Sequence, residues 1–385
     1  MKRILLVIVI SQFLCTSVWF AGNAVLSDLI KALHLSPGFL VQLTTAVQMG
    51  FICGTLLFAV LALADRFSPS YLFCTCALFA AGTNGLMGIP NLGPAGMLSA
   101  RFLTGFFLAG IYPVGMKIAA DHFAEGLGKS LGWLVGALVF GTSLPHLLKT
   151  LTLDLDWKTV VFATSGLAII GGLLIRFFVP YGPHRKKGGG WNVAGLGRSF
   201  SIPGFRGAAS GYFGHMWELY AFWTFVPVIL AHYVNSNPAI SLNVSLWSFV
   251  VIAVGGVACI LAGFCSQRLG PKQIATVALA LSGCCCLLSP LMIGTSSLPL
   301  LLLFLVCWGM FVVADSPLFS TLVAQNAPAT SRGTALTIVN CIGFTITILS
   351  IQLLNILSAH LQFNYLFLVL SPGPILGILA LWRNR

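Results

Sequence analysis

Long apolar stretches recur along the whole chain, and they constrain its fold more than any other feature. Each is bounded by charges, prolines or glycine clusters and has about the 20 residues that a helix needs to span a bilayer. They predict an all-α polytopic membrane protein with twelve transmembrane helices, over residues 4–30, 39–63, 70–88, 95–120, 127–148, 159–179, 207–234, 241–265, 271–294, 297–325, 333–356 and 363–381.

Charge is too scarce for a soluble protein. Only 7% of the 385 residues are charged, against about 25% in soluble domains. The net charge of +12 would otherwise point to nucleic acid, but the basic residues lie beside the apolar stretches, so we expect no nucleic acid partner. The sequence contains no Gly-x-x-x-x-Gly-Lys-Ser/Thr loop for a nucleotide phosphate, and we expect neither ATP nor another cofactor.

The 11 cysteines all lie within apolar segments. We therefore expect no disulfide framework. Cys284, Cys285 and Cys286 are consecutive, and consecutive residues of a helix point in different directions, so we expect no metal site there.

The two ends of the predicted helices differ in basic residues. Outer loops hold only Lys31, Lys149 and Lys158, and apart from Arg101 all other lysines and arginines lie on the opposite side. The positive-inside rule therefore places both termini in the cytoplasm, and the short loops favour a bacterial inner membrane. The basic run 185–187 in the one long loop could contact anionic membrane lipid, or the loop could be a plain solvated linker.

The two halves of the chain also repeat. Offsets of 202 to 205 residues relate Trp19 to Trp223, Pro113 to Pro317, Asp65-Arg66 to Gln267-Arg268, and Gly128 to Gly333. A nearly constant offset indicates duplication. Parallel repeats of this kind place a solute site between the halves, near the membrane midplane.

Two loop motifs carry a family resemblance. The chain resembles the major facilitator superfamily, whose loop after the second helix usually reads Gly-x-x-x-Asp-Arg/Lys-x-Gly-Arg/Lys-Arg/Lys and is repeated after the eighth. The first copy here keeps Asp65 and Arg66 and loses both glycines; the second keeps Gly263, Arg268, Gly270 and Lys272 but replaces the acid with Gln267. The run from Arg101 to Gly105 is similar to a pattern on the superfamily's fourth helix. Gly132, Gly136, Gly141 and Pro145 partly resemble the antiporter signature, without its Gly-Pro pair.

The resemblance implies a layout and a gate. It implies a six-helix bundle over 1–180, a cytoplasmic linker over 181–206 and a second six-helix bundle over 207–385, with the first, fourth, seventh and tenth helices around a central cavity. It further implies that Asp65 and Arg66 act in gating, where the carboxylate caps a neighbouring helix. Because Gln267 cannot supply the same charge, we expect the inner gate to be asymmetric.

Three charged residues fall deep inside predicted helices: Arg101, Glu218 and Asp315. Each costs at least about 2.5 to 3.5 kcal/mol at a helix centre, so we expect a shared cavity or paired charges. His215 and Glu218 are three residues apart on one helical face and form a candidate proton-binding pair; a structural hydrogen bond between helices is the alternative. Arg101 suits a carboxylate or phosphate, or it could snorkel to the outer interface.

Asp315 precedes Pro317, which predicts a kink in the tenth helix, as Pro113 does in the fourth. Asp315 could carry a coupling proton or meet a cationic group, or it could form an ion pair with Arg101 that locks the halves. Aromatic and amide residues of the inward helices are candidates for the cavity wall: Gln12, Trp19, Asn23, Tyr112, Trp217, Tyr220 and Trp223.

These features predict a secondary active transporter, expected as a monomer, that moves a small polar or anionic organic solute by alternating access. A proton is the expected coupling ion. Proton-driven efflux of an amphipathic compound is the alternative within transport. A membrane enzyme would need a clustered catalytic set, which the dispersed histidines do not provide, and a sensor would usually add a soluble extension; neither is expected.

Overall fold

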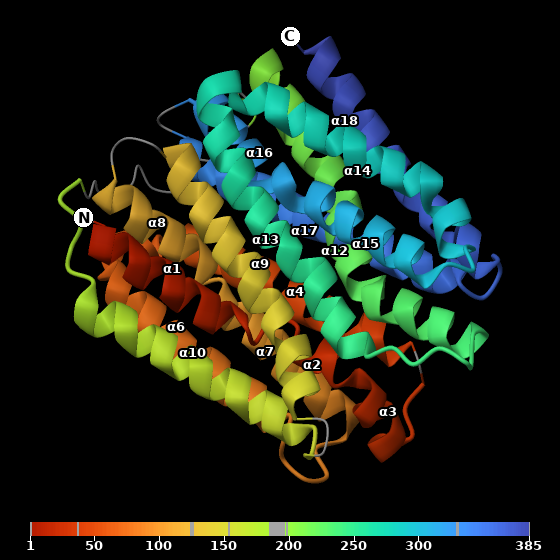
Figure 1. The fold of residues 1–385 in the computed structure, drawn as a ribbon. Helices are drawn as coiled ribbons and strands as arrows, with labels where there is room; N and C mark the ends of the chain where they lie inside the picture. Colours follow the sequence, from red (N-terminus) through yellow and green to blue (C-terminus); the bar gives the residue numbers. More distant parts are fainter. Residues whose placement is uncertain are drawn as a thin grey trace. The chain divides into compact units, whose positions relative to one another are not determined.

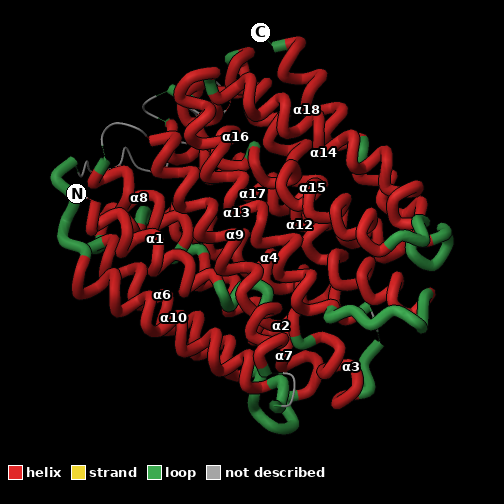
Figure 2. Tube along the Cα trace, in the orientation of Figure 1, coloured by secondary structure: helices red, strands yellow, loops and turns green. Residues whose placement is uncertain are grey.

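The computed structural model describes residues 2–36, 38–123, 127–152, 155–184, 197, 199–328 and 331–384. All regular structure in these ranges is helical, joined by short loops (Figure 2). Glu125, Asp154 and the basic run 185–187 lie outside the described residues, as does most of the expected linker.

The chain divides into two compact units, Met1–Trp191 and Asn192–Arg385. The boundary falls inside the expected linker 181–206. Helices of the first unit are α1 (Lys2–Thr16), α2 (Ala21–Ala24), α3 (Leu26–Leu33), α4 (Phe39–Val60), α5 (Leu63–Arg66), α6 (Pro69–Leu86), α7 (Gly93–Leu108), α8 (Tyr112–His122), α9 (Leu127–Leu151) and α10 (Lys158–Phe178).

Helices of the second unit are α12 (Pro203–Ser236), α13 (Val244–Leu269), α14 (Pro271–Ile293), α15 (Leu298–Ala314), α16 (Ser316–Asn326), α17 (Arg332–Leu357), the 3₁₀ helix η1 (Phe363–Leu370) and α18 (Pro372–Arg383). α12 begins at Pro203, so its first turn occupies the end of the expected linker. In the described residues, nine helical spans are long and apolar enough to cross a membrane. The other three predicted crossings correspond to α1–α3, to α6 and to α12, and the twelve-helix fold is confirmed.

Four predicted helices are interrupted, and the last of these breaks lies at Ser371, between η1 and α18. α7 and α8 are separated at Ala109–Ile111, and α15 and α16 at Asp315, with Pro113 and Pro317 in the first turn of the following helix in each case. Proline tolerates that position because its missing N–H would have no partner there. The first helix breaks between Thr16 and Ala21 without any proline.

Several helix pairs at corresponding places of the two units are in contact, and Figure 1 labels the helices of each unit. In the first unit α4 packs against α7, and α1 packs against α9 and α10. α10 also lies beside α6. In the second unit α13 packs against α15, and α12 packs against α17 and α18. Helices in corresponding places of the predicted repeat therefore make corresponding contacts.

Glycines at repeat-related positions allow the closest of these crossings. A Cβ at Gly105 would overlap the backbone of Val47, and one at Gly309 would overlap the backbone of Val251. Both pairs are related by the same 204-residue offset. Small residues let membrane helices approach closely enough for backbone contact, and this contact is made at the same repeat position in each unit.

Candidate functional site

Arg101 binds the break in the first helix. Its Nη1 donates to the carbonyl oxygen of Val18 at 2.8 Å, and its Nη2 donates to the carbonyl oxygen of Trp19. These carbonyls belong to the unwound turn between α1 and α2, where regular helical hydrogen bonding stops. Backbone polar groups inside a bilayer must find partners within the protein, and the planar guanidinium of Arg101 supplies them.

Asn84 on α6 connects Arg101 to α10. Its Oδ1 accepts from Arg101 Nη1 at 3.1 Å, and its Nδ2 lies 3.0 to 3.1 Å from Ser165 Oγ, Thr164 Oγ1 and the carbonyl oxygen of Val161. Asn84 was absent from the predicted site. Its signal in the sequence was an amide inside an apolar helix, which is costly unless it is hydrogen-bonded.

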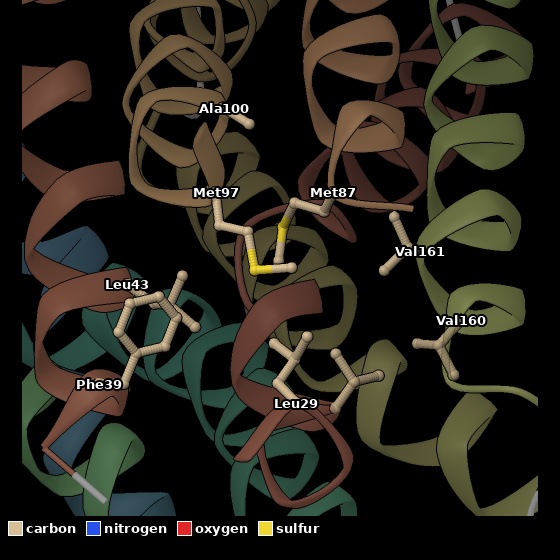
Figure 3. Close-up of a cluster of buried hydrophobic side chains, with 9 residues drawn as sticks. Leu29, Phe39, Leu43, Met87, Met97, Ala100, Val160 and Val161 are labelled. Atoms are coloured by element: carbon tan, nitrogen blue, oxygen red, sulfur yellow. The ribbon is translucent and has the colours of Figure 1, made fainter. Parts of the chain in front are cut away.

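Arg101 is 0% exposed, so its guanidinium does not snorkel to an interface. An apolar cluster from four helices lies one turn away, with Met97 on the same helix and Met87 pointing toward it (Figure 3). Among the described residues no carboxylate lies within 4.0 Å of Arg101. Its positive charge is therefore held by neutral acceptors.

In the second unit, His215 pairs with Asp315. Nδ1 of His215 on α12 lies 2.8 Å from Oδ1 of Asp315, which occupies the break between α15 and α16. Both side chains are buried, with the rings of Tyr212 and Phe319 about the imidazole. Within the described residues, His215 Nε2 and Asp315 Oδ2 have no hydrogen-bond partner. Each member of the pair thus keeps one polar atom open to a proton, a water or a solute group.

Glu218 has different partners from those expected. Its Oε1 accepts from Trp308 Nε1 at 2.5 Å and its Oε2 accepts from Ser282 Oγ at 2.9 Å. His215 and Glu218 share α12, but the imidazole is directed to Asp315 and the carboxyl to α14 and α15. Asp315 is still close enough to Glu218 for an electrostatic interaction. Trp308 and Ser282 were not predicted, because they lie in other helices, far away in the sequence.

The predicted cavity-wall residues have mixed environments. Gln12 is buried, and neither atom of its amide has a hydrogen-bond partner among the described residues. Asn23 donates to Thr44 Oγ1 at 2.9 Å, and Trp217 donates to the carbonyl oxygen of Val369 at 3.0 Å.

The remaining members of that set are aromatic. Trp19 packs against Phe51, and Tyr220 contacts both Trp223 and Phe344 with ring centroids 5.2 and 5.1 Å apart. Trp19, Tyr220 and Trp223 are buried, whereas Tyr112 and Trp217 are half-buried.

A family model described as Major Facilitator Superfamily matches residues 8–344 and 208–385. The first match alone covers more than half of the chain. The chain belongs to the major facilitator superfamily.

As a member of this superfamily, the protein is an integral membrane transporter of small-molecule solutes and not an enzyme. Two similar solved structures are the human organic anion transporter MFSD10 (TETRAN) and the proton:xylose symporter XylE bound to 6-bromo-6-deoxy-D-glucose. The first has 15% identity and a TM-score of 0.76 over 99% of each chain. The second has 13% identity and a TM-score of 0.78, over 99% of this chain and 94% of the other. No curated protein matches the chain.

The two copies of the superfamily's loop motif differ in structure. In the first copy Asp65 forms an ion pair with Lys117 of α8 at 2.9 Å, and Ala62 adopts a left-handed conformation with φ of 51° before α5. Arg66 is exposed.

In the second copy Gly270, with φ of 83°, joins α13 to α14, a conformation that favours glycine. Gly263 is buried, while Gln267, Arg268 and Lys272 are exposed. Only the first copy therefore contributes an acid to an ion pair.

Proposed function

We propose that this superfamily protein moves a small polar or anionic organic solute by alternating access, coupled to a proton that is held in its second unit. The observation that carries the proposal is the burial of Glu218, His215 and Asp315 in one helical bundle with no lysine or arginine partner among the described residues. A buried carboxylate without a fixed cation is costly in a membrane protein. Binding a proton removes that cost, and contact with water restores the charge.

The charge of Arg101 favours a solute that is anionic or carries several hydroxyl groups. Its charge is fixed, and the acceptors that hold it are neutral, so the field of the cation is not cancelled by a nearby acid in the described part of the chain. The two solved structures that resemble the protein are named for an organic anion and for a sugar carried with a proton. Both solutes belong to the proposed class.

The first experiment identifies the solute and the direction of coupling. Purified protein is screened by thermal shift against organic acids, amino acids, sugars and drugs, and the stabilising compounds are then tested for uptake into liposomes with and without a pH gradient. We expect accumulation of a labelled polar or anionic solute only when protons enter with it. The aromatic cluster of Tyr220, Trp223 and Phe344 favours the alternative, efflux of an amphipathic compound, and solute export against inward proton flow would establish that alternative instead.

The second experiment assigns the proton to Glu218. We expect Glu218→Gln to lose gradient-driven accumulation while it keeps counterflow exchange, because glutamine retains the shape and hydrogen bonds of the protonated acid but cannot release a proton. Ser289→Ala removes a buried hydroxyl of α14 that donates to the carbonyl oxygen of Cys286, and it serves as the control. Accumulation by Glu218→Gln at the parent rate would contradict the assignment.

We further propose that the two units act as separate moving bodies, that both termini lie in the cytoplasm of a bacterial inner membrane, and that the protein works as a monomer. The even number of crossings and the basic inner loops support this topology. Labelling of single cysteines introduced at each terminus, in sealed right-side-out vesicles, tests the orientation. Reaction with an impermeant reagent would contradict it.

A further inference from the structure

The Ser282 hydroxyl faces two acceptors and has only one hydrogen. Its Oγ lies 2.9 Å from Glu218 Oε2 and 3.1 Å from the carbonyl oxygen of Leu279, three residues earlier on α14. A serine hydroxyl donates once and can accept through its lone pairs. It can therefore donate to only one of these oxygens at a time, and which one receives the hydrogen depends on the state of Glu218.

When Glu218 is ionised, the Ser282 hydrogen points to its carboxylate, since a bond to a charged acceptor is the stronger one. When Glu218 is protonated, its own O–H donates to Ser282 Oγ, and the serine hydrogen turns to Leu279. Trp308 Nε1 donates to the other carboxyl oxygen in either case. Both states are thus hydrogen-bonded without displacement of any heavy atom.

We propose that Ser282 is a two-state positioning residue that reverses its hydrogen bond when Glu218 gains or loses a proton. This inference rests on the proton-binding role proposed above. A buried polar atom without a hydrogen-bond partner is costly, so a partner that could bond to only one protonation state of Glu218 would destabilise the other state. The Ser282 hydroxyl can bond to both protonation states, so the carboxyl of Glu218 can remain buried through the whole transport cycle.

The surroundings of Glu218 leave this task to Ser282. Three titratable groups interact with Glu218: the thiol of Cys286 on α14, which is hydrogen-bonded to the Glu218 carboxyl, the thiol of Cys285 on the same helix, and the carboxyl of Asp315. His215 lies one turn away on α12. A thiol is a weak donor and a weak acceptor. Within the described residues, no other element that packs against α12 brings a charged group into interaction with Glu218.

The arrangement is also specific to the second unit. The 204-residue offset relates Glu218 and Trp308 to Leu14 and Thr104 in the first unit. α6 and α14 begin 202 residues apart, at Pro69 and Pro271, so Ser282 corresponds to Ala80, which is buried as well. None of these positions in the first unit carries an acid, and the packing of the bundle does not require a hydroxyl at Ala80. Ser282 is therefore explained by its partner and not by the repeated scaffold.

Infrared difference spectroscopy of the purified protein, titrated with pH, tests the inference without any transport measurement. The carbonyl stretch of protonated Glu218 is assigned as the band that Glu218→Gln removes. We expect this band to move to higher frequency in Ser282→Ala, because the acid loses the acceptor for its hydrogen. Ser282→Thr should restore the parent frequency, and Ser289→Ala, which removes a comparable buried hydroxyl on the same helix, should leave it unchanged.

Ser282→Cys is a second variant that can be measured if Ser282→Ala does not fold. Its thiol is close in size to the hydroxyl but bonds weakly, so the band should move in the same direction as in Ser282→Ala. A band at the parent frequency in a folded alanine or cysteine variant would overturn the inference and leave the proton-binding role intact. If no Glu218 band appeared at any pH, the carboxyl would carry no proton, and the proposed coupling role would fall together with the inference.

Discussion

The two units of this transporter share a scaffold and differ in chemistry. Each has a glycine crossing at the same repeat position and a broken helix that restarts at the same offset, at Tyr112 and at Ser316. The first unit buries a cation, Arg101, whose repeat counterpart is Leu305; the second buries the acid Glu218, whose counterpart is Leu14. The features that the two units share, the glycine crossings and the broken helices, are those on which backbone packing depends. The buried charged residues, by contrast, differ between the units.

This difference between the units supports the proposed functional role of the charged groups more than their burial alone does. Neither Arg101 nor Glu218 has an ionic partner among the described residues. The repeat provides an internal comparison, because the other unit has leucine at the corresponding position. Neither Arg101 nor Glu218 is required by the crossing of the helices that carry it. The following experiments test where the equivalence of the units ends.

The largest effect is expected at the shared crossings. Gly105→Val and Gly309→Val should each abolish folded protein, because the new side chain would overlap the backbone of Val47 or Val251, at a cost of more than about 3 kcal/mol. Recovery of monodisperse protein after detergent extraction measures the effect. Gly166→Val and Gly333→Val, where an added Cβ meets nothing within 4 Å, are the matched controls. Tolerance at one crossing only would show that the units do not pack equivalently.

Replacement of Arg101 comes next. Arg101→Leu introduces the residue of the other unit and removes the donors for Val18, Trp19 and Asn84. With about 1 to 3 kcal/mol for each unsatisfied buried group, we expect a loss of about 3 kcal/mol or more, measured as a lower melting temperature in detergent. Arg101→Lys keeps the charge without the planar fork and should recover only part of it. A leucine variant as stable as the parent would mean that the break in the first helix needs no donor.

The pair of His215 and Asp315 provides a smaller, local contrast. Its repeat counterparts are Ser11 and Ile111, which form no ion pair. A double-mutant cycle with His215→Gln and Asp315→Asn should give a coupling energy of about 1 to 3 kcal/mol. A cycle with Ser11→Ala and Ile111→Val should be additive within about 0.5 kcal/mol. Thermal unfolding measures both cycles, and equal coupling in the two units would remove the contrast.

The sequence predicted the helices of this transporter and its buried charged residues, but it did not predict the hydrogen-bond partners of those residues. The apolar runs and the two prolines predicted the crossings and the kinks at Pro113 and Pro317, because both depend on local chemistry. The break after Thr16 has no proline, and its donor is Arg101, more than 80 residues further along the chain. Trp308 likewise lies 90 residues from Glu218. Such partners depend on how helices cross, which the pattern within one helix does not encode.

The smallest expected difference lies between the two loop motifs. The ion pair of Asp65 and Lys117 leaves 28% and 24% of the two side chains exposed, so it is worth only about 0.2 to 1 kcal/mol. Asp65→Asn should therefore change the transport rate by a few-fold at most, with little change in melting temperature. Gln267→Ala removes an exposed amide and should change the rate less. Counterflow rates of the two variants and of Lys117→Gln, which breaks the same ion pair from its other side, make the comparison. If Gln267→Ala were the slower variant, the second copy of the motif would control the cycle, and the asymmetry of the gate would run opposite to that of its charges.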